Sequence, residues 1–328
     1  MEKITRIILI LFFSFSSITF SQEVTKGQPE PVKELPRFII KPKFPTNVAF
    51  HFKRTEKTKV TQSFSDSSKR VIERNYDLYF TYYSPSKPDK GVTKLIVSID
   101  SLTYSFKVGK DSIYYNSQDD NLVPPLSRPD YDANSAILGK EFNFYYSPYW
   151  DFGKIDGKRI DEVRRYINDP NDGILDTLRN YYWNYRLSDD YLTNIVDILK
   201  GFIPNSSIDT STILKIPFKI DIEEIQLLDS SAKVKLTETT SQLYKIKGKI
   251  NNLKNLKNQI RIFGFDRLVD IVNCSGSGEY ELLITPQGRI DGSNSNFKVN
   301  LLLRDRKELI NEQIEEVINY QLLRNYKI

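Results

Sequence analysis

Cysteine and histidine are almost absent from this sequence of 328 residues, which contains one of each, Cys274 and His51. A single cysteine excludes an intrachain disulfide. Two such side chains cannot fill the three or four positions of a zinc shell, so we predict neither a metal site nor a cofactor. A Ser-His-Asp or Cys-His arrangement would need His51 as its base, and the local alternation places His51 on the polar side of a strand. We therefore predict no catalytic residues.

Long apolar runs are also lacking. One run, Ile7–Phe20, lies in residues 1–21 and is shorter than the ~20 residues that span a bilayer. Lys3 and Arg6 precede it, and this arrangement is typical of a signal peptide. No cysteine lies near its end, which excludes a lipid-modified N-terminus. We expect an exported protein, periplasmic or extracellular and not lipid-anchored, without a transmembrane segment after signal removal.

A strong excess of charge is missing too, because the net charge is only +5. This balance gives no signature of nucleic-acid binding. Lysines do gather after residue 244, but Lys245, Lys247 and Lys249 alternate with apolar residues. The alternation indicates the solvent face of a half-buried strand, or a lysine-guarded edge, rather than an anion site.

One stretch of the chain occurs twice. Residues 139–148 read Gly-Lys-Glu-Phe-Asn-Phe-Tyr-Tyr-Ser-Pro, and residues 277–286 read Ser-Gly-Glu-Tyr-Glu-Leu-Leu-Ile-Thr-Pro. The similar pentapeptides Gly-Lys-Ile-Asp-Gly at 153–157 and Gly-Arg-Ile-Asp-Gly at 288–292 follow them. In both copies an apolar strand is stopped by proline, turned through glycine and restarted at isoleucine. We infer two related β units.

Alternating apolar residues predict strands in both halves of the chain, and helical spacing predicts three helices between them. The expected strands are 48–53, 57–65, 70–83, 92–108, 111–116, 212–225, 232–247, 256–263, 266–273, 278–285 and 289–303. The expected helices are 160–167, 174–185 and 188–201. From Lys307 onward the spacing favours an amphipathic helix, with a final strand as the alternative.

These elements predict an organisation in five parts. They are a signal peptide (1–21), a proline-rich linker (22–46) with Phe38–Ile40 as an edge strand, a first β unit (47–157), a helical insert (158–202) and a second β unit (203–328). The predicted fold class is α+β, mainly antiparallel β, with two related curved sheets or half-barrels and helices packed at their junction.

Two clusters of neighbouring aromatic residues occur in the first hairpin and on the second helix. Adjacent aromatic side chains cannot all face one core, so some should line a groove, although ordinary core packing is the alternative. The candidate ligand-binding residues are Tyr146, Tyr149, Trp150, Tyr182 and Trp183.

The order of features resembles an uncharacterised family of secreted bacterial β-rich proteins. The residues that carry this resemblance are Ser112-Ile113-Tyr114-Tyr115-Asn116-Ser117 and Leu138-Gly139-Lys140 before the first hairpin. The family implies no activity. More loosely, the layout resembles periplasmic lipoprotein carriers, whose curved antiparallel sheet holds an apolar ligand against helices; this likeness is architectural and does not establish function.

We expect a secreted or periplasmic binding protein that is not an enzyme. Its expected partner is an apolar or lipid-like ligand, or another envelope component, held between sheet and helices. The first alternative is a surface module that binds glycans or proteins through exposed aromatics. The second is a hydrolase that uses paired carboxylates. The sequence does not reveal the oligomeric state.

Overall fold

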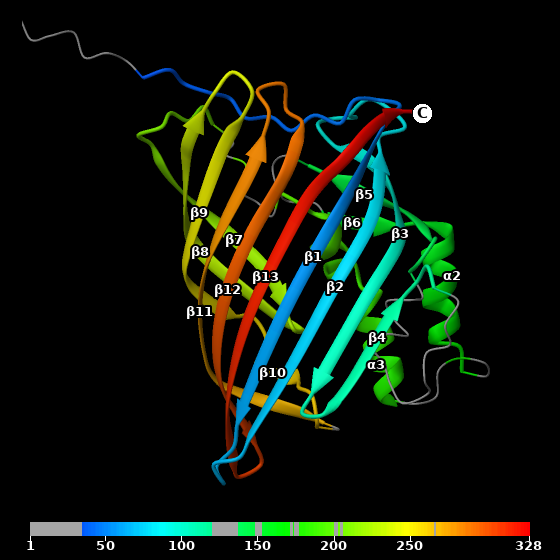
Figure 1. Ribbon diagram of the computed structural model, residues 1–328, viewed down its shortest axis with the longest axis vertical. Helices are drawn as coiled ribbons and strands as arrows, with labels where there is room; N and C mark the ends of the chain where they lie inside the picture. The colour runs from blue at the N-terminus through cyan, green and yellow to red at the C-terminus, as the bar shows by residue number, and fades with distance from the viewer. Residues whose placement is uncertain are drawn as a thin grey trace, which may run out of the picture. The chain divides into compact units, whose positions relative to one another are not determined.

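The strands of the described residues join in a single antiparallel sheet, shown in Figure 1. The computed structural model describes residues 35–119, 137–147, 153–170, 173, 177–199, 203, 206–265 and 267–328. For residues 177–179 and 182 the structure describes the backbone but not the side chains. The predicted signal peptide lies outside this part of the chain.

The first half of the chain forms six strands and is followed by three described helices. The strands are β1 (Val48–Ser63), β2 (Lys69–Tyr83), β3 (Thr93–Val108), β4 (Asp111–Asn116), β5 (Glu141–Tyr146) and β6 (Gly153–Asp156). The helices are α2 (Lys158–Ile167), α3 (Thr177–Arg186) and α4 (Asp189–Val196).

The second half returns to strands, including the longest in the described structure. These are β7 (Ile213–Ile222), β8 (Ile225–Thr239), β9 (Tyr244–Asn255), β10 (Gln259–Arg261), β11 (Leu268–Ile284), β12 (Ile290–Asp305) and β13 (Glu308–Lys327). All of the described pairings between these strands are antiparallel.

The strand order explains how the two halves meet. The sheet runs β6-β5-β3-β2-β1-β13-β12-β11-β9-β8-β7, with β4 and β10 paired beside it. Each half is thus an up-and-down meander, and β1 pairs with β13 from Val48↔Lys327 to Ser63↔Asn311. The mainly antiparallel α+β class is confirmed, while the strands form one continuous open sheet instead of two.

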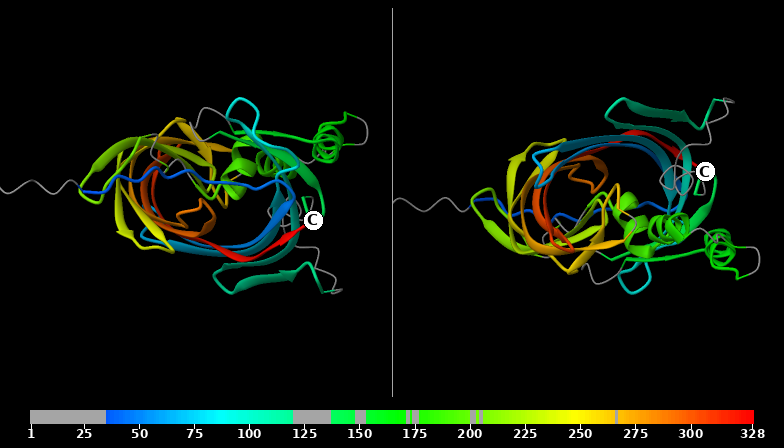
Figure 2. Two further views of the ribbon diagram at one scale, coloured as in Figure 1. Left: turned by 90° about the horizontal axis from the view of Figure 1, so that it is seen from above. Right: turned by 90° about the horizontal axis from the view of Figure 1, so that it is seen from below.

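Helix α4 packs against both ends of the sheet. It contacts β6 and β7, the strands at the two ends of the sheet order. Seen from above and below in Figure 2, the sheet curves, and the helical segment lies at its concave side. Ser188 caps α4 by accepting a hydrogen bond from the Tyr191 amide at 3.2 Å. A helix that covers sheet edges protects unpaired backbone groups from other chains.

The core lies on the concave face of the sheet. Alternate side chains of each long strand are buried, as in β13, where Ile310, Ile314 and Ile318 are fully buried. Leu192 and Ile195 of α4 join the same core. Burial of apolar surface is the main stabilising contribution to such a fold.

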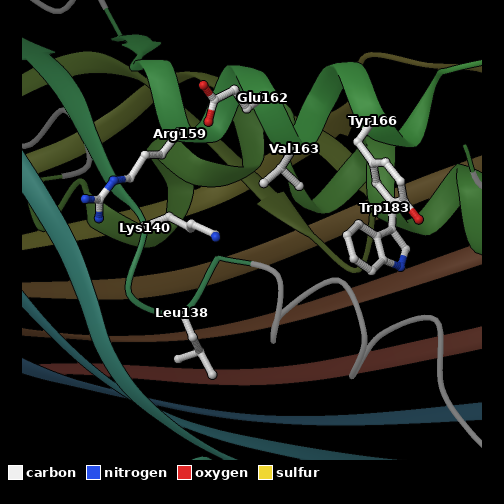
Figure 3. A pocket seen from close by; sticks show the side chains of 7 residues that line it. All are labelled: Leu138, Lys140, Arg159, Glu162, Val163, Tyr166 and Trp183. Atoms are coloured by element: carbon white, nitrogen blue, oxygen red, sulfur yellow. The ribbon is translucent and has the colours of Figure 1, made fainter. Parts of the chain in front are cut away.

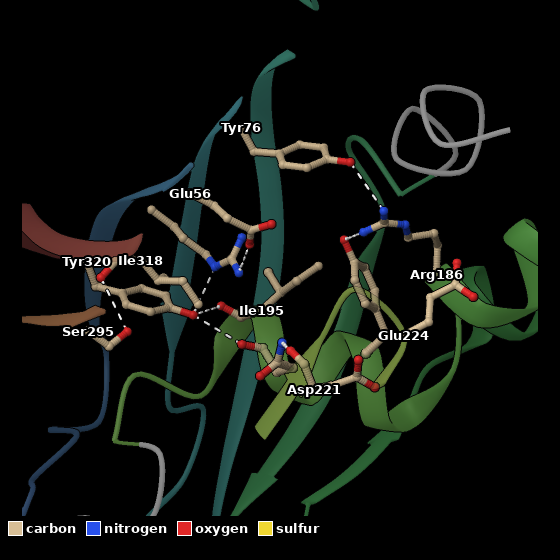
Figure 4. A network of polar contacts seen from close by, with 12 residues as sticks. Glu56, Tyr76, Arg186, Ile195, Asp221, Glu224, Ser295, Ile318 and Tyr320 are labelled. Atoms are coloured by element: carbon tan, nitrogen blue, oxygen red, sulfur yellow. Dashed lines mark hydrogen bonds and ion pairs between the residues drawn. The ribbon is translucent and has the colours of Figure 1, made fainter. Parts of the chain in front are cut away.

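Charged side chains cross this core. Arg54 on β1 pairs with Glu56, and its Nε donates to the Tyr320 hydroxyl at 3.0 Å. The Tyr320 hydroxyl in turn donates to the Ile195 carbonyl of α4 at 2.8 Å. Figure 4 shows this network together with Arg186, which contacts Tyr76 at 3.3 Å. A buried charge is tolerated because these partners satisfy it.

The C-terminal segment is a strand, so the amphipathic helix predicted from Lys307 onward is wrong. Along β13 every second side chain is buried, including Glu312 and Glu316. Because these two inward positions carry carboxylates, the apolar residues of the segment do not alternate regularly in the sequence. Their spacing instead matched that of an amphipathic helix.

Other predicted boundaries moved for local reasons. The predicted strand 232–247 is interrupted at residues 240–243, where the Thr240 hydroxyl accepts the Leu243 amide at 2.9 Å and makes a turn. The segments 266–273 and 278–285 are both parts of β11. Helix α4 ends at Val196, because Asp197 is already extended.

In the two copies of the repeated hairpin, equivalent apolar residues are buried, but the strands are paired in different registers. Phe142 and Tyr280 are both buried, as are Ile155 and Ile290. In the first copy, however, Tyr146 pairs with Gly153, whereas in the second Ile284 pairs with Ile290 past a bulge. The first hairpin lies at an end of the sheet and leads into α2, while the second lies inside it. Descent of both halves from one ancestor stays a prediction.

The predicted contact of Phe38–Ile40 with the body is confirmed. Phe38 and Ile208 form an isolated antiparallel bridge with hydrogen bonds of 2.8 and 2.9 Å. Ile40 is buried, and the Lys43 amide donates to the Gly288 carbonyl at 2.8 Å. Residues 35–46 therefore pack across the sheet.

Candidate functional site

Protein side chains pack closely between the sheet and α4 near Phe44 and Tyr146. A void there, lined by Phe44, Tyr82, Tyr146 and Leu199 among others, has a volume of only about 10 Å³. A volume of this size holds at most one water molecule. The described core therefore leaves no room at this point for the ligand expected between sheet and helices.

A larger cleft lies on the outer side of α2 and α3, and Figure 3 shows its lining. Its volume is about 640 Å³, within the range of small-molecule sites. It is bounded by the turn before β5, by one face of α2 and by α3. The lining residues are Leu138, Lys140, Arg159, Glu162, Val163, Tyr166 and Trp183.

Helix α2 supplies four of these residues from a single face. Arg159, Glu162, Val163 and Tyr166 are spaced by three, one and three positions, which places their side chains along one side of a helix. Ile160 and Ile167 lie three positions before and four positions after Val163, on the adjoining side of the helix, and both are buried in the core. Burial of that side fixes which face of α2 is presented to the cleft.

The helices on either side of the cleft are tied together by hydrogen bonds. Asn168 and Asn184 exchange bonds of 2.9 and 3.1 Å, and Asn180 donates to the Ile167 carbonyl at 3.0 Å. Arg164 donates to the Leu187 carbonyl at 2.8 Å, which ties α2 to the turn before α4. These bonds hold the cleft in one shape before any ligand arrives.

Trp183 combines a packed ring with an unused donor. The ring is half-buried and packs against the core, and its Nε1 is buried without a hydrogen-bond partner among the described residues. An indole N–H normally finds an acceptor when it is buried. Trp183 therefore contributes its ring surface to the cleft, while its N–H is shielded from solvent.

The charge of the lining is positive. Lys140 and Arg159 face one acid, Glu162, and neither cation forms an ion pair within the described part of the chain. The apolar surface comes from Leu138 and Val163 together with the aromatic rings. The cleft thus offers apolar contact, hydrogen-bond donors and positive charge in one place.

The structure brings one of the sequence-predicted ligand residues into this cleft, Trp183. Tyr146 lies elsewhere, buried in the core with its ring against Phe44 at a centroid distance of 5.6 Å. Tyr149 and Trp150 lie outside the described residues, as does the side chain of Tyr182. The α2 residues were missed, although their helical spacing could have marked them.

His51 contacts neighbouring polar groups on the outer face of the sheet. Its Nδ1 is 2.9 Å from the Thr81 hydroxyl and 3.2 Å from Asp100. The Thr81 hydroxyl donates to Asp100 at 2.6 Å, so its proton is not directed to the histidine as an activated nucleophile requires. Cys274 is buried in the core, and burial raises the pKa of its thiol.

No cluster of three or more His, Cys, Asp or Glu side chains in the described part of the chain could hold a metal ion. None of the described helices is long and apolar enough to cross a membrane.

No family model matches the chain, and no characterised protein matches it in sequence. Among solved structures, one of lipovitellin that concerns lipid–protein interactions has 10% identity and a TM-score of 0.45 over 87% of this chain. The chain spans 26% of that lipovitellin chain. OpdQ from Pseudomonas aeruginosa has 8% identity and a TM-score of 0.23, covering 84% of this chain and 99% of its own. An outer-membrane channel from Pseudomonas putida F1 has 9% identity and a TM-score of 0.19, covering 86% and 97%. Similarities this weak do not identify an activity.

Proposed function

We propose that this chain is a non-catalytic binding protein for a small amphipathic ligand, with an apolar or aromatic body and an acidic group. The ligand occupies the cleft of about 640 Å³ beside α2 and α3. The observation that carries the proposal is the lining, which sets the Trp183 ring and Val163 beside two cations, Lys140 and Arg159. A lipid-like ligand thus remains the expected class, but its place is the outer cleft instead of the sheet interior.

The acidic group of the ligand is expected from the charges of the lining. Lys140 and Arg159 supply two cations against the single carboxylate of Glu162. A hydrogen bond to a charged group is stronger than one between neutral groups, so an anionic ligand gains more here than a neutral one. The apolar part packs on Val163 and on the Trp183 ring.

A fluorescence titration tests this proposal. The chain has two tryptophans, so a Trp150→Phe background leaves Trp183 as the sole indole reporter. The probe is 8-anilinonaphthalene-1-sulfonate, which joins an aromatic body to an anionic group, and dodecanoate is the competitor. We expect one saturable site per chain and displacement of the probe by dodecanoate.

Two variants assign the binding to the cleft. In the wild-type background, Trp183→Ala should weaken probe binding by roughly tenfold, because an aromatic contact worth about 1.4 kcal/mol is lost. Arg159→Gln should also weaken it, whereas Lys158→Gln is the matched control, since Lys158 is exposed on the same helix outside the lining. Equal affinity in Arg159→Gln and Lys158→Gln would contradict the proposal.

A glycan site is the second candidate, because Tyr166 is 56% exposed and lies in the cleft with Trp183. Exposed aromatic faces are suited to sugar rings. Neutral oligosaccharides that compete with the probe more strongly than dodecanoate would favour this reading. The hydrolase alternative has less support, since glycoside hydrolysis needs two carboxylates and the described lining has one, Glu162.

A further inference from the structure

Six lysines form a two-dimensional array on the outer face of β7, β8 and β9. The pairing register places Lys215 opposite Lys233 and Lys233 opposite Lys249, and it places Lys235 opposite Lys247. Residues paired across neighbouring strands project from the same face of a sheet. We call this surface the lysine face; its members are Lys215, Lys233, Lys235, Lys245, Lys247 and Lys249.

These side chains point to solvent. The residues between them on β8, Ala232, Val234 and Leu236, are fully buried on the concave side. All of the lysines except Lys245 are exposed, and Lys245 is half-buried. Figure 1 shows β7, β8 and β9 at the end of the sheet away from β3. The array is therefore accessible along its whole extent in the described structure.

Carboxylates offset only part of this charge. Lys245 pairs with Glu238 at 3.2 Å and Lys247 pairs with Glu281 at 3.4 Å. The other four lysines form no ion pair in the described part of the chain, and of these Lys249 lies opposite Glu279 of β11. Like charges directly opposite each other destabilise a sheet. An arrangement that costs stability and leaves cations without partners indicates a binding surface.

The spacing of the charges indicates the kind of partner. Neighbouring strands lie about 5 Å apart, and alternate residues of one strand lie about 7 Å apart, so the lysines extend in two directions. A linear polyanion would contact one row, whereas the negatively charged surface of a bilayer extends in both directions as the lysines do. Ile213, 59% exposed on β7 opposite Lys235, adds an apolar side chain to the same face.

We propose that the lysine face docks on the surface of a membrane that contains anionic phospholipids. The contact is electrostatic, and it holds the sheet against the headgroups without inserting a segment into the bilayer. The sequence pattern of Lys245, Lys247 and Lys249 was interpreted as a solvated strand face. The register with β7 and β8, which the sequence does not reveal, turns that single row into an array.

Vesicle sedimentation tests the docking. Full-length mature protein is mixed with vesicles of phosphatidylcholine alone, or of phosphatidylcholine with phosphatidylglycerol, at low and at physiological salt. We expect binding to the anionic vesicles only, and we expect it to weaken as salt rises. Binding that does not distinguish the two vesicle types would overturn the proposal.

A pair of triple variants locates the contact. Lys233→Gln with Lys235→Gln and Lys249→Gln should lower partitioning on the order of a hundredfold, because each lost lysine leaves about a fifth of the affinity. The control variant is Lys57→Gln with Lys59→Gln and Lys107→Gln, which changes three exposed lysines on β1 and β3. In the strand register, Lys59 and Lys107 both lie opposite Glu73 of β2. We expect the control to keep most of its binding, and circular dichroism establishes that both variants fold.

Two other results would contradict the assignment. If both triple variants lose vesicle binding equally, net charge and not the lysine face is responsible. If heparin or an oligonucleotide binds through the same three lysines while anionic vesicles do not, the partner is a linear polyanion and the membrane proposal is wrong. The cleft is not involved in this test, so its outcome does not depend on the proposed ligand.

Discussion

Buried carboxyl groups are the residues whose chemistry depends most on the fold. Glu312 is 4% exposed on the inner face of β13, and Gln62 Nε2 donates to its carboxylate at 2.8 Å. Burial raises the pKa of Glu312 to about 7, although the bond from Gln62 acts in the opposite direction. The nearby charge of Glu223 raises this pKa further.

This shift makes the stability of the protein depend on pH. Between the unfolded pKa near 4.5 and the folded pKa of about 7, the folded state holds a proton that the unfolded state has released. The contribution of Glu312 to the free energy of unfolding is therefore fully present below 4.5 and lost as the pH rises through 7.

We expect Glu312→Gln to remove this dependence. The amide keeps the hydrogen bond to Gln62 without a titrating group, so the variant should gain a few kcal/mol relative to wild type at pH 8 and little at pH 5. Urea unfolding at both pH values measures the difference. Glu315→Gln is the matched control, since its side chain is on the outer face in an exposed pair with Lys298. The same gain in both variants at pH 8 would contradict the assignment.

The pair of Arg54 and Glu56 is the second residue-scale case. Arg54 is 2% exposed and contacts Glu56 and Tyr320. Arg54→Met should destabilise the fold by about 3–5 kcal/mol, because it leaves the Glu56 carboxylate buried without its partner. The double variant Arg54→Met with Glu56→Leu should recover much of that loss, and a double-mutant cycle in urea measures it. Additive losses would show that the two side chains do not act as a pair.

At the scale of elements, the sequence predicted which strands and helices exist better than where they begin and end. Nearly all of β1 to β3 follows from the alternation of apolar residues, and the predicted start of the third helix at residue 188 agrees with the observed cap of α4. The type of β13 was predicted wrongly because Glu312 and Glu316 occupy inward positions. Their partners, such as Gln62, lie hundreds of residues away in the chain. No local pattern contains that information.

The strand assignment of β13 itself leads to a prediction. Glu315 lies in a strand paired on both sides, with Lys59 on β1 and Lys298 on β12. Glu315→Pro removes a ladder donor and should cost about 3 kcal/mol or more. Glu315→Ala is its control and should cost below about 1 kcal/mol, because it loses one exposed ion pair. Similar urea midpoints for the two variants would argue against a central strand here.

At the scale of the whole sheet, the pairing of β1 with β13 could not be predicted from the sequence. It joins residues that are far apart in the chain, such as Ser63 with Asn311 and Val48 with Lys327, and it converts two meanders into one sheet. Because the two meanders form one curved sheet, α4 can contact both of its end strands. The repeated hairpins suggested two sheets because local similarity carries no information about what pairs with each copy.

In the candidate site too, local sequence predicted one residue, whereas the cleft depends on contacts between distant segments. Trp183 was named from its aromatic neighbours, but the cleft exists because α2 turns Arg159 and Tyr166 toward it and the turn at Leu138 closes the other side. Those segments meet only in three dimensions. An apolar ligand is an expectation from the sequence, whereas the charges of the lining depend on which face α2 presents to the cleft.

The most direct test of the cleft is the indole N–H signal of Trp183 in a proton–nitrogen correlation spectrum. The chain has two tryptophans, so Trp150→Phe leaves one indole signal to follow. On addition of dodecanoate we predict that this signal shifts until a one-to-one complex is reached, because the ring that carries the N–H lines the cleft and contacts the ligand. A signal that stays in place while dodecanoate saturates the protein would contradict binding at this cleft.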